Sequence, residues 1–308
     1  MPECELMKEK PHPHVCEAGP PIAPPAGGVP AYAELCVTSN YTFLTGASHP
    51  EEYVVQAAGL GYRAVAITDL HTVAGVVRAH VEAKNVGGAG GAGGGSTGTR
   101  FVLGSRVRLG DLPGCAVCLY PTDLASYGRL CRLLTLGKRR APKGSCWLNV
   151  PDLEAFHEGV LAIVILDSDD EWAVRYAREI ADERREGERA STRAATKGAS
   201  SATTPKPGGT DAEQPGGRWR EGDRGDHEED ERARDAAILR RLRVIFDDDR
   251  LSLAGRVLYG GRDDEVLARC AALSRETGVP MVATSDAYQH HPQRRMLHDV
   301  LTCIRHTC

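Results

Sequence analysis

The chain alternates between strand-like apolar runs and helical patterns, and this alternation restricts its fold more than any other feature. Between most of the runs, apolar residues recur at spacings of three and four, which predicts amphipathic helices. Strands that are apolar on both faces are typical of a parallel sheet covered by helices. The seven predicted strands are residues 33–39, 64–69, 100–109, 115–122, 160–166, 251–258 and 280–287.

Seven such strands can close into a barrel or form an open, doubly wound sheet. No G-x-G-x-x-G motif follows the first strand, which disfavours the dinucleotide-binding form of the open sheet. We therefore expect an α/β fold, specifically a seven-stranded (β/α) barrel. In such barrels the functional side chains lie at the C-terminal ends of the strands.

Three segments interrupt the alternation and divide the chain. Residues 1–31 contain many prolines without hydrophobic periodicity, which predicts a flexible leader. A glycine-rich stretch at 87–98 and a polar, charged stretch at about 187–230 have the composition of disordered insertions. The barrel is expected to span residues 32–290 around these two insertions.

The composition indicates an ordinary soluble protein. Of its 308 residues, 41% are hydrophobic and 26% are charged, and the net charge of −4 provides no global basic field for binding nucleic acid. Ten scattered cysteines without a signal-peptide pattern indicate reduced thiols and a cytoplasmic location. No apolar stretch approaches the roughly 20 residues that a membrane-spanning helix needs, so no membrane partner is expected.

Polar residues at the predicted strand ends are the candidates for a metal site. Cys36, Asp69, His71 and Asp286 could converge, but a hydrolytic metal centre needs more carboxylate and imidazole ligands than these. Arg106 at the same edge would repel a cation. The alternative is structural: both aspartates would cap helices, and His71 would be an exposed residue in the first turn of the next helix.

A second candidate site is a basic loop that follows a predicted helix. Lys138, Arg139, Arg140 and Lys143 fall within ten residues and could contact a nucleic-acid phosphate backbone. A solvated loop, or a contact with another domain, explains the same pattern. The sequence is consistent with a nucleic-acid contact and with a structural or solvated loop.

Four segments resemble one known family. They read AELCVTSNYTFLTGASHPEE, AVAITDLHTVAGVVRAHVEAK, YGRLCRLLTLGKRRAPKG and GVPMVATSDAYQHHPQRRMLHDVLTCIRHTC. Together they are similar to the N-terminal polymerase-and-histidinol-phosphatase (PHP) domain of bacterial C-family DNA polymerase III alpha subunits, of the error-prone type used in damage-induced synthesis. The similarity runs from about 32 to 308 apart from the insertions, and it implies a seven-stranded barrel of PHP type.

The resemblance implies a degenerate metal site, as the first two motifs already show. Active PHP domains have H-x-H on the first strand, where this chain has Cys36 and Thr38. Their second motif, T-D-H-G, keeps its aspartate here as Asp69 but has Leu70 in place of the histidine.

The later motifs are changed in the same way. The glutamate expected on the third strand is Arg106, and the last motif, N-D-x-H, keeps Asp286 but has Tyr288 in place of its histidine. The resemblance therefore implies a metal-free scaffold, with Zn²⁺ or Mn²⁺ bound only if the relict site still works.

The family's polymerase centre implies further expectations. It uses palm aspartates and Mg²⁺ in a region downstream of the barrel, and residues 291–308 resemble the start of the connection to that region. We expect DNA to be bound through a polymerase region of the same or a separate chain. The alternatives are a residual metal-dependent phosphoesterase and a nucleic-acid-binding module.

Overall fold

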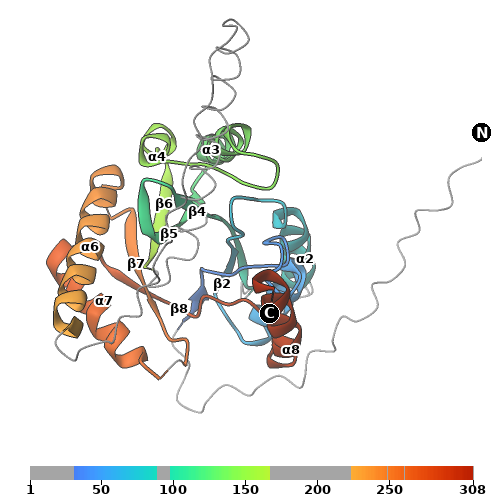
Figure 1. Cartoon of the computed structure of the whole chain (residues 1–308). Helices are drawn as coiled ribbons and strands as arrows, with labels where there is room; N and C mark the ends of the chain where they lie inside the picture. The colour runs from blue at the N-terminus through green and yellow to red at the C-terminus, as the bar shows by residue number, and fades with distance from the viewer. Residues whose placement is uncertain (1–30, 89–97, 167–222, 248, 260, 308) are drawn as a thin grey trace, which may run out of the picture.

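The order of helices and strands largely follows the predicted alternation. The computed structural model describes residues 31–88, 98–166, 223–247, 249–259 and 261–307 (Figure 1). The strands are β1 (Ala33–Glu34), β2 (Ala64–Ile67), β3 (Arg100–Leu103), β4 (Ser105–Leu109), β5 (Leu112–Pro121), β6 (Val160–Leu166), β7 (Leu251–Arg256) and β8 (Met281–Thr284). The helices are α1 (Pro50–Gly59), α2 (Val76–Gly88), α3 (Leu124–Arg140), α4 (Val150–Phe156), α6 (Asp223–Ile245), α7 (Asp263–Thr277), the short 3₁₀ helix η2 (Pro292–Arg294) and α8 (Arg295–His306).

The strands form two sheets instead of the closed ring that the sequence predicts. One sheet is parallel with the order β1-β2-β3, and the other has the order β4-β5-β6-β7-β8. Isolated bridges between Val37 and Ala287 and between Leu70 and Arg106 connect segments of the two sheets. The fold is thus mixed α/β, and the predicted seven-stranded barrel is not confirmed.

The predicted strand 100–109 is two strands, separated at Gly104. A Cβ at this position would lie 2.9 Å from Thr68 Cγ2 and 2.9 Å from the Tyr120 ring. Only glycine lets the backbone approach these side chains so closely. The chain therefore passes from the three-stranded sheet to the five-stranded sheet at a glycine.

The prediction of a wholly parallel sheet is wrong for β5, which is antiparallel to both β4 and β6. Only Gly110 and Asp111 separate β4 from β5. Two residues can form a hairpin but cannot make the crossover that parallel neighbours need. The antiparallel arrangement therefore follows from the length of this connection.

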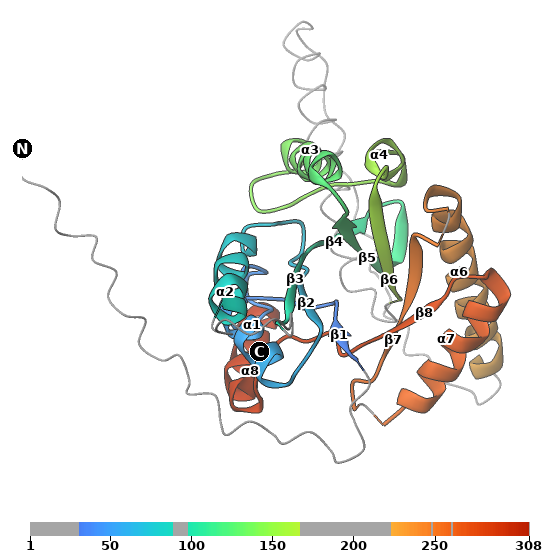
Figure 2. The same cartoon turned by 180° about the vertical axis from the view of Figure 1, so that it is seen from behind.

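Helices cover the outside of the sheets in three groups. Figures 1 and 2 show α6 and α7 beside β7 and β8. The helices α1, α2 and α8 lie beside the three-stranded sheet, and α3 and α4 lie beyond β4–β6. Within the described part of the chain, no helix is both long and apolar enough to cross a membrane.

The two faces of β5 belong to different apolar clusters. Cys115, Val117 and Leu119 pack with the helices, whereas Cys118 and Tyr120 pack with Cys36. Cys115 and Cys118 therefore point to opposite sides of β5, and both pack in the core.

Most of the leader and of the two predicted insertions lies outside the described residues.

Candidate functional site

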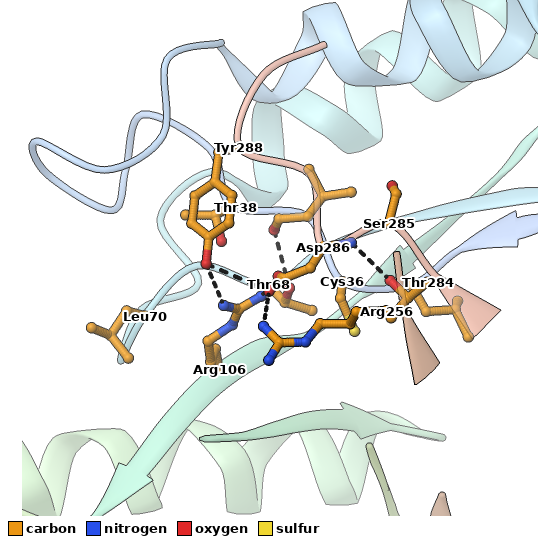
Figure 3. A network of polar contacts seen from close by, with 12 residues as sticks. Cys36, Thr38, Thr68, Leu70, Arg106, Arg256, Thr284, Ser285, Asp286 and Tyr288 are labelled. Atoms are coloured by element: carbon orange, nitrogen blue, oxygen red, sulfur yellow. Dashed lines mark hydrogen bonds and ion pairs between the residues drawn. The ribbon is translucent and has the colours of Figure 1, made fainter. Parts of the chain in front are cut away.

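The centre of the site is Asp286, which follows β8 and is 2% exposed. Arg106 on β4 donates to Oδ1 of this carboxylate, and Nη1 of Arg256 on β7 donates to Oδ2 at 3.0 Å. Figure 3 shows both guanidinium groups pointing at Asp286. Each carboxylate oxygen thus has a cationic partner from a neighbouring strand.

Tyr288 completes this network. Arg106 Nη1 lies 3.3 Å from the Tyr288 hydroxyl, which lies 3.5 Å from Asp286 Oδ2 (Figure 3). Burial alone would raise the pKa of Asp286, but Arg106 and Arg256 outweigh this effect and lower it. Asp286 is therefore an ionised carboxylate inside a group of hydrogen-bond donors, and not the helix cap of the structural alternative.

Asp69 is wholly buried and binds the loop that follows β1. Its Oδ1 accepts from the Ser39 amide at 2.8 Å and from the Thr42 hydroxyl at 2.9 Å, while Oδ2 accepts from the Ser39 hydroxyl at 2.7 Å. Burial raises the pKa of Asp69, and these hydrogen bonds only partly offset the effect. Asp69 holds this loop in place and does not cap a helix.

His71 is not the exposed first-turn residue of the structural alternative. It is 8% exposed and has a left-handed backbone with φ of 55°, and α2 begins five residues later at Val76. Its Nε2 accepts from the Arg108 amide at 3.0 Å. The imidazole thus contacts the backbone of β4.

Cys36 lies inside the fold, where its thiol contacts Cys118 and lies 3.8 Å from the Tyr120 hydroxyl. The hydrogen bond with Cys118, together with burial, raises the pKa of Cys36. Burial would also raise the pKa of Cys118, but the Cys36 hydrogen bond and the charge of Arg106 lower it to about 7. The two thiols therefore form a buried pair close to Arg106.

Two charged residues of this region were not predicted as site residues. Arg256 pairs with Asp286 and also donates to the Leu166 carbonyl at 2.7 Å. Glu34, at 3% exposure, accepts from the Cys36 amide at 2.9 Å and from the Ser285 amide at 2.8 Å. The only sequence signal for either residue is a single charge within an apolar strand pattern.

The predicted ligands do not fit a divalent metal ion. The oxygens of Asp286 are bound by guanidinium groups and those of Asp69 by hydroxyl and amide donors. Among the residues that the structure describes, no group of three or more His, Cys, Asp or Glu side chains is arranged to hold a metal. The prediction of a metal-free site remains to be tested by experiment.

Three residues of the predicted basic loop, Lys138, Arg139 and Arg140, form the last turn of α3 instead, and only Lys143 follows the helix. Arg140 forms an ion pair with Asp152 at 2.6 Å, whereas Lys138, Arg139 and Lys143 are exposed. Basic residues in the last turn of a helix also interact favourably with the helix dipole. Nucleic-acid binding by this cluster stays a prediction.

Comparisons with known proteins give a consistent result. The chain is 32% identical over 280 residues to error-prone DNA polymerase 1 of Agrobacterium fabrum, covering 91% of this chain and 19% of that protein. It is 35% identical over 278 residues to the error-prone DNA polymerase of Rhodopseudomonas palustris strain BisB5, covering 90% of this chain and 19% of that protein. The chain thus spans about a fifth of the length of these relatives.

The family comparison covers half of the chain. Residues 34–188 match the family described as PHP domain. The matched range contains the end of β1 and all of β2 to β6, with Asp69 and Arg106, while Arg256 and Asp286 come from later parts of the chain. The chain belongs to the PHP domain family.

Proposed function

We propose that the chain is the PHP part of an error-prone DNA polymerase and that it serves as a scaffold without metal chemistry of its own. One observation carries the scaffold role: Arg106 and Arg256 bind both oxygens of Asp286. Two guanidinium charges at this position oppose the binding of a divalent cation. They also occupy both carboxylate oxygens, which a metal ion would need as ligands.

Asp69 supports the same proposal. Its three short hydrogen bonds come from Ser39 and Thr42, so metal binding would have to displace neutral donors that fix the loop after β1. Leu70 is apolar and offers no ligand atom. In this proposal the residues at the strand ends stabilise the fold and take no part in a metal-dependent reaction.

DNA synthesis, in this proposal, belongs to the polymerase region that makes up most of each relative. About four-fifths of each error-prone polymerase relative has no counterpart in the chain. Nucleotidyl transfer needs two Mg²⁺ ions held by carboxylates. The proposed role of the PHP part is to support that region, through which DNA would be bound.

The first test is the metal content of the purified chain, measured by mass spectrometry. The chain is incubated with Zn²⁺ or Mn²⁺ and then exchanged into metal-free buffer, and Asp69→Ala is carried through the same steps. We expect both proteins to retain less than about a tenth of an ion per chain. One or more ions retained by the wild type and lost in Asp69→Ala would overturn the scaffold role.

An activity assay separates the scaffold from a residual phosphoesterase. Hydrolysis of a chromogenic phosphate ester is measured with each metal for the wild type, Asp69→Ala and Asp286→Asn. The scaffold predicts equal background rates for all three. Metal-dependent hydrolysis that both substitutions abolish would favour the phosphoesterase.

The basic loop is tested separately. The affinity for a DNA duplex is measured at two salt concentrations for the wild type and for a variant with Arg139→Ala and Lys143→Ala. A nucleic-acid-binding role predicts salt-sensitive binding that weakens in this variant. Equal affinity of the two proteins would leave the loop as a solvated surface.

A further inference from the structure

The last helix of the chain turns an apolar stripe toward solvent. None of the residues of α8 is buried, and Met296, Val300 and Ile304 are 78%, 50% and 55% exposed. Residues spaced by four lie on one face of a helix, and Leu297 at 40% exposure lies beside them. We call Met296, Leu297, Val300 and Ile304 the α8 face.

The opposite side of α8 is attached to the rest of the fold by polar contacts. Arg294, directly before the helix, pairs with Glu52 on α1. The His298 ring lies 5.7 Å from the Tyr288 ring. Figure 2 shows α8 beside α1. These contacts fix the orientation of the helix, so the apolar stripe cannot turn inward without breaking them.

The loop after β1 meets the C-terminal end of α8. Arg305 donates to the Thr45 hydroxyl at 3.1 Å, which places the loop next to the helix. Phe43 in this loop is 84% exposed.

The charges around the stripe describe the surface that would match it. Arg295 has an 81% exposed side chain and lies 4.0 Å from the carboxylate of Asp299, one turn further along α8. Arg305 and His306 are exposed at the other end of the helix. A complementary surface would have an apolar groove with an acidic rim.

We propose that the α8 face is the docking surface for the polymerase region that makes up the other four-fifths of the error-prone polymerase relatives. Because a 12-residue helix is marginal on its own, an apolar stripe on it needs a partner. The stripe contributes nothing to the apolar clusters that the described residues form. This inference rests on the proposed function and adds where the partner would bind.

The test mixes this chain with the remainder of the Rhodopseudomonas palustris strain HaA2 polymerase, a relative that is 37% identical over the shared region. Affinity is measured by interferometry for the wild type, Val300→Asp and Ile304→Asp. Leu124→Asp is the matched control, since Leu124 is 84% exposed at the start of α3, on another part of the molecule. Circular dichroism checks that all variants are folded.

We expect both α8 variants to bind at least tenfold more weakly, which is an order-of-magnitude expectation for a charge placed in an apolar interface. The control should bind within about threefold of the wild type. Tight binding that the α8 variants leave unchanged would overturn the docking site. So would the absence of any complex, and so would a homodimer that Val300→Asp dissociates, since the occupant would then be a second copy.

The proposed function fails in a different way. Its failure appears as retained metal or as metal-dependent phosphoesterase activity in the chain alone, and neither result depends on α8. A metal-free chain whose α8 variants bind like the wild type would therefore reject only the docking site.

Discussion

Replacing Asp286 with asparagine should be strongly destabilising. The side chain of Asp286 is 1% exposed, and those of Arg106 and Arg256 are 8% and 16% exposed, so neither arginine can reach water easily. Asparagine has nearly the same shape but removes the negative charge and turns an amide donor toward a guanidinium donor. Breaking a buried ion pair by removing one partner costs about 3–5 kcal/mol, and we expect Asp286→Asn to fall in this range.

The reasoning is tested by a double-mutant cycle. Arg106→Met leaves Asp286 with Arg256 and should cost about 1.5–3 kcal/mol, the value of a hydrogen bond to a charged group. The double variant lacks both the carboxylate and one of the two buried cations, so it should lose less than the sum of the single variants. Residues in direct contact couple by about 0.5–3 kcal/mol.

The free energy of unfolding would be measured at pH 7 by urea titration followed by circular dichroism, with the slope compared among variants. The control is Asp264→Asn, because Asp264 is exposed in the first turn of α7. It should cost no more than about 1 kcal/mol through the helix dipole. A loss below about 1 kcal/mol for Asp286→Asn, or strict additivity in the cycle, would refute the buried pair.

The contribution of Asp286 to the free energy of unfolding should depend on pH in a defined direction. The folded-state pKa of Asp286 lies below its ordinary value, so its stabilisation is fully present above the unfolded pKa and is lost as the pH falls through the folded pKa. The difference in stability between the wild type and the double variant should therefore shrink only in strong acid. A difference that already disappears between pH 5 and pH 7 would contradict this assignment.

Two further substitutions probe the surrounding structure. Gly104→Ala should cost about 1–3 kcal/mol because its Cβ would lie 2.9 Å from the side chains of Thr68 and Tyr120. Gly128→Ala, where a Cβ meets nothing within 4 Å in the middle of α3, should instead stabilise by about 0.5–1 kcal/mol. Asp69→Ala should cost about 2–4 kcal/mol, because three buried donors lose their acceptor. Urea titration measures all three, and the opposite order of the two glycine variants would contradict the close approach at Gly104.

Much of the secondary structure was predictable because apolar periodicity reports which residues face a core. Periodicity does not report which strands pair. Pairing depends on the lengths of the connections and on contacts between segments that are distant in the sequence. The hairpin of β4 and β5 shows this, because residues 110–114 were predicted to be the gap between two parallel strands, whereas the strands are antiparallel and only Gly110 and Asp111 connect them. The break at Gly104 depends on Tyr120, which is 16 residues away and comes close only in the folded chain.

The site was predictable only in part for a similar reason. Asp69, Arg106 and Asp286 were recognised as strand-end residues, but their partners come from segments distant in the sequence. Arg256 lies in a strand whose single charge is equally consistent with an exposed edge. His71 was misread because its left-handed backbone, and with it the direction of the ring, cannot be inferred from spacing.

Arg256 also determines how the site would respond to restored ligands. The variant Leu70→His, Arg106→Glu, Tyr288→His places family-type ligands at three positions but leaves Arg256 bound to Asp286. We expect it to retain no Zn²⁺ after exchange into metal-free buffer, because the guanidinium still occupies a ligand oxygen and its charge opposes the cation. Adding Arg256→Gln frees that oxygen and removes the charge, so the quadruple variant should retain more metal than the triple variant. Metal content by mass spectrometry compares the two after circular dichroism has checked their folding. Full retention by the triple variant would mean that Arg256 does not protect Asp286, and that the loss of ligands alone explains the degenerate site.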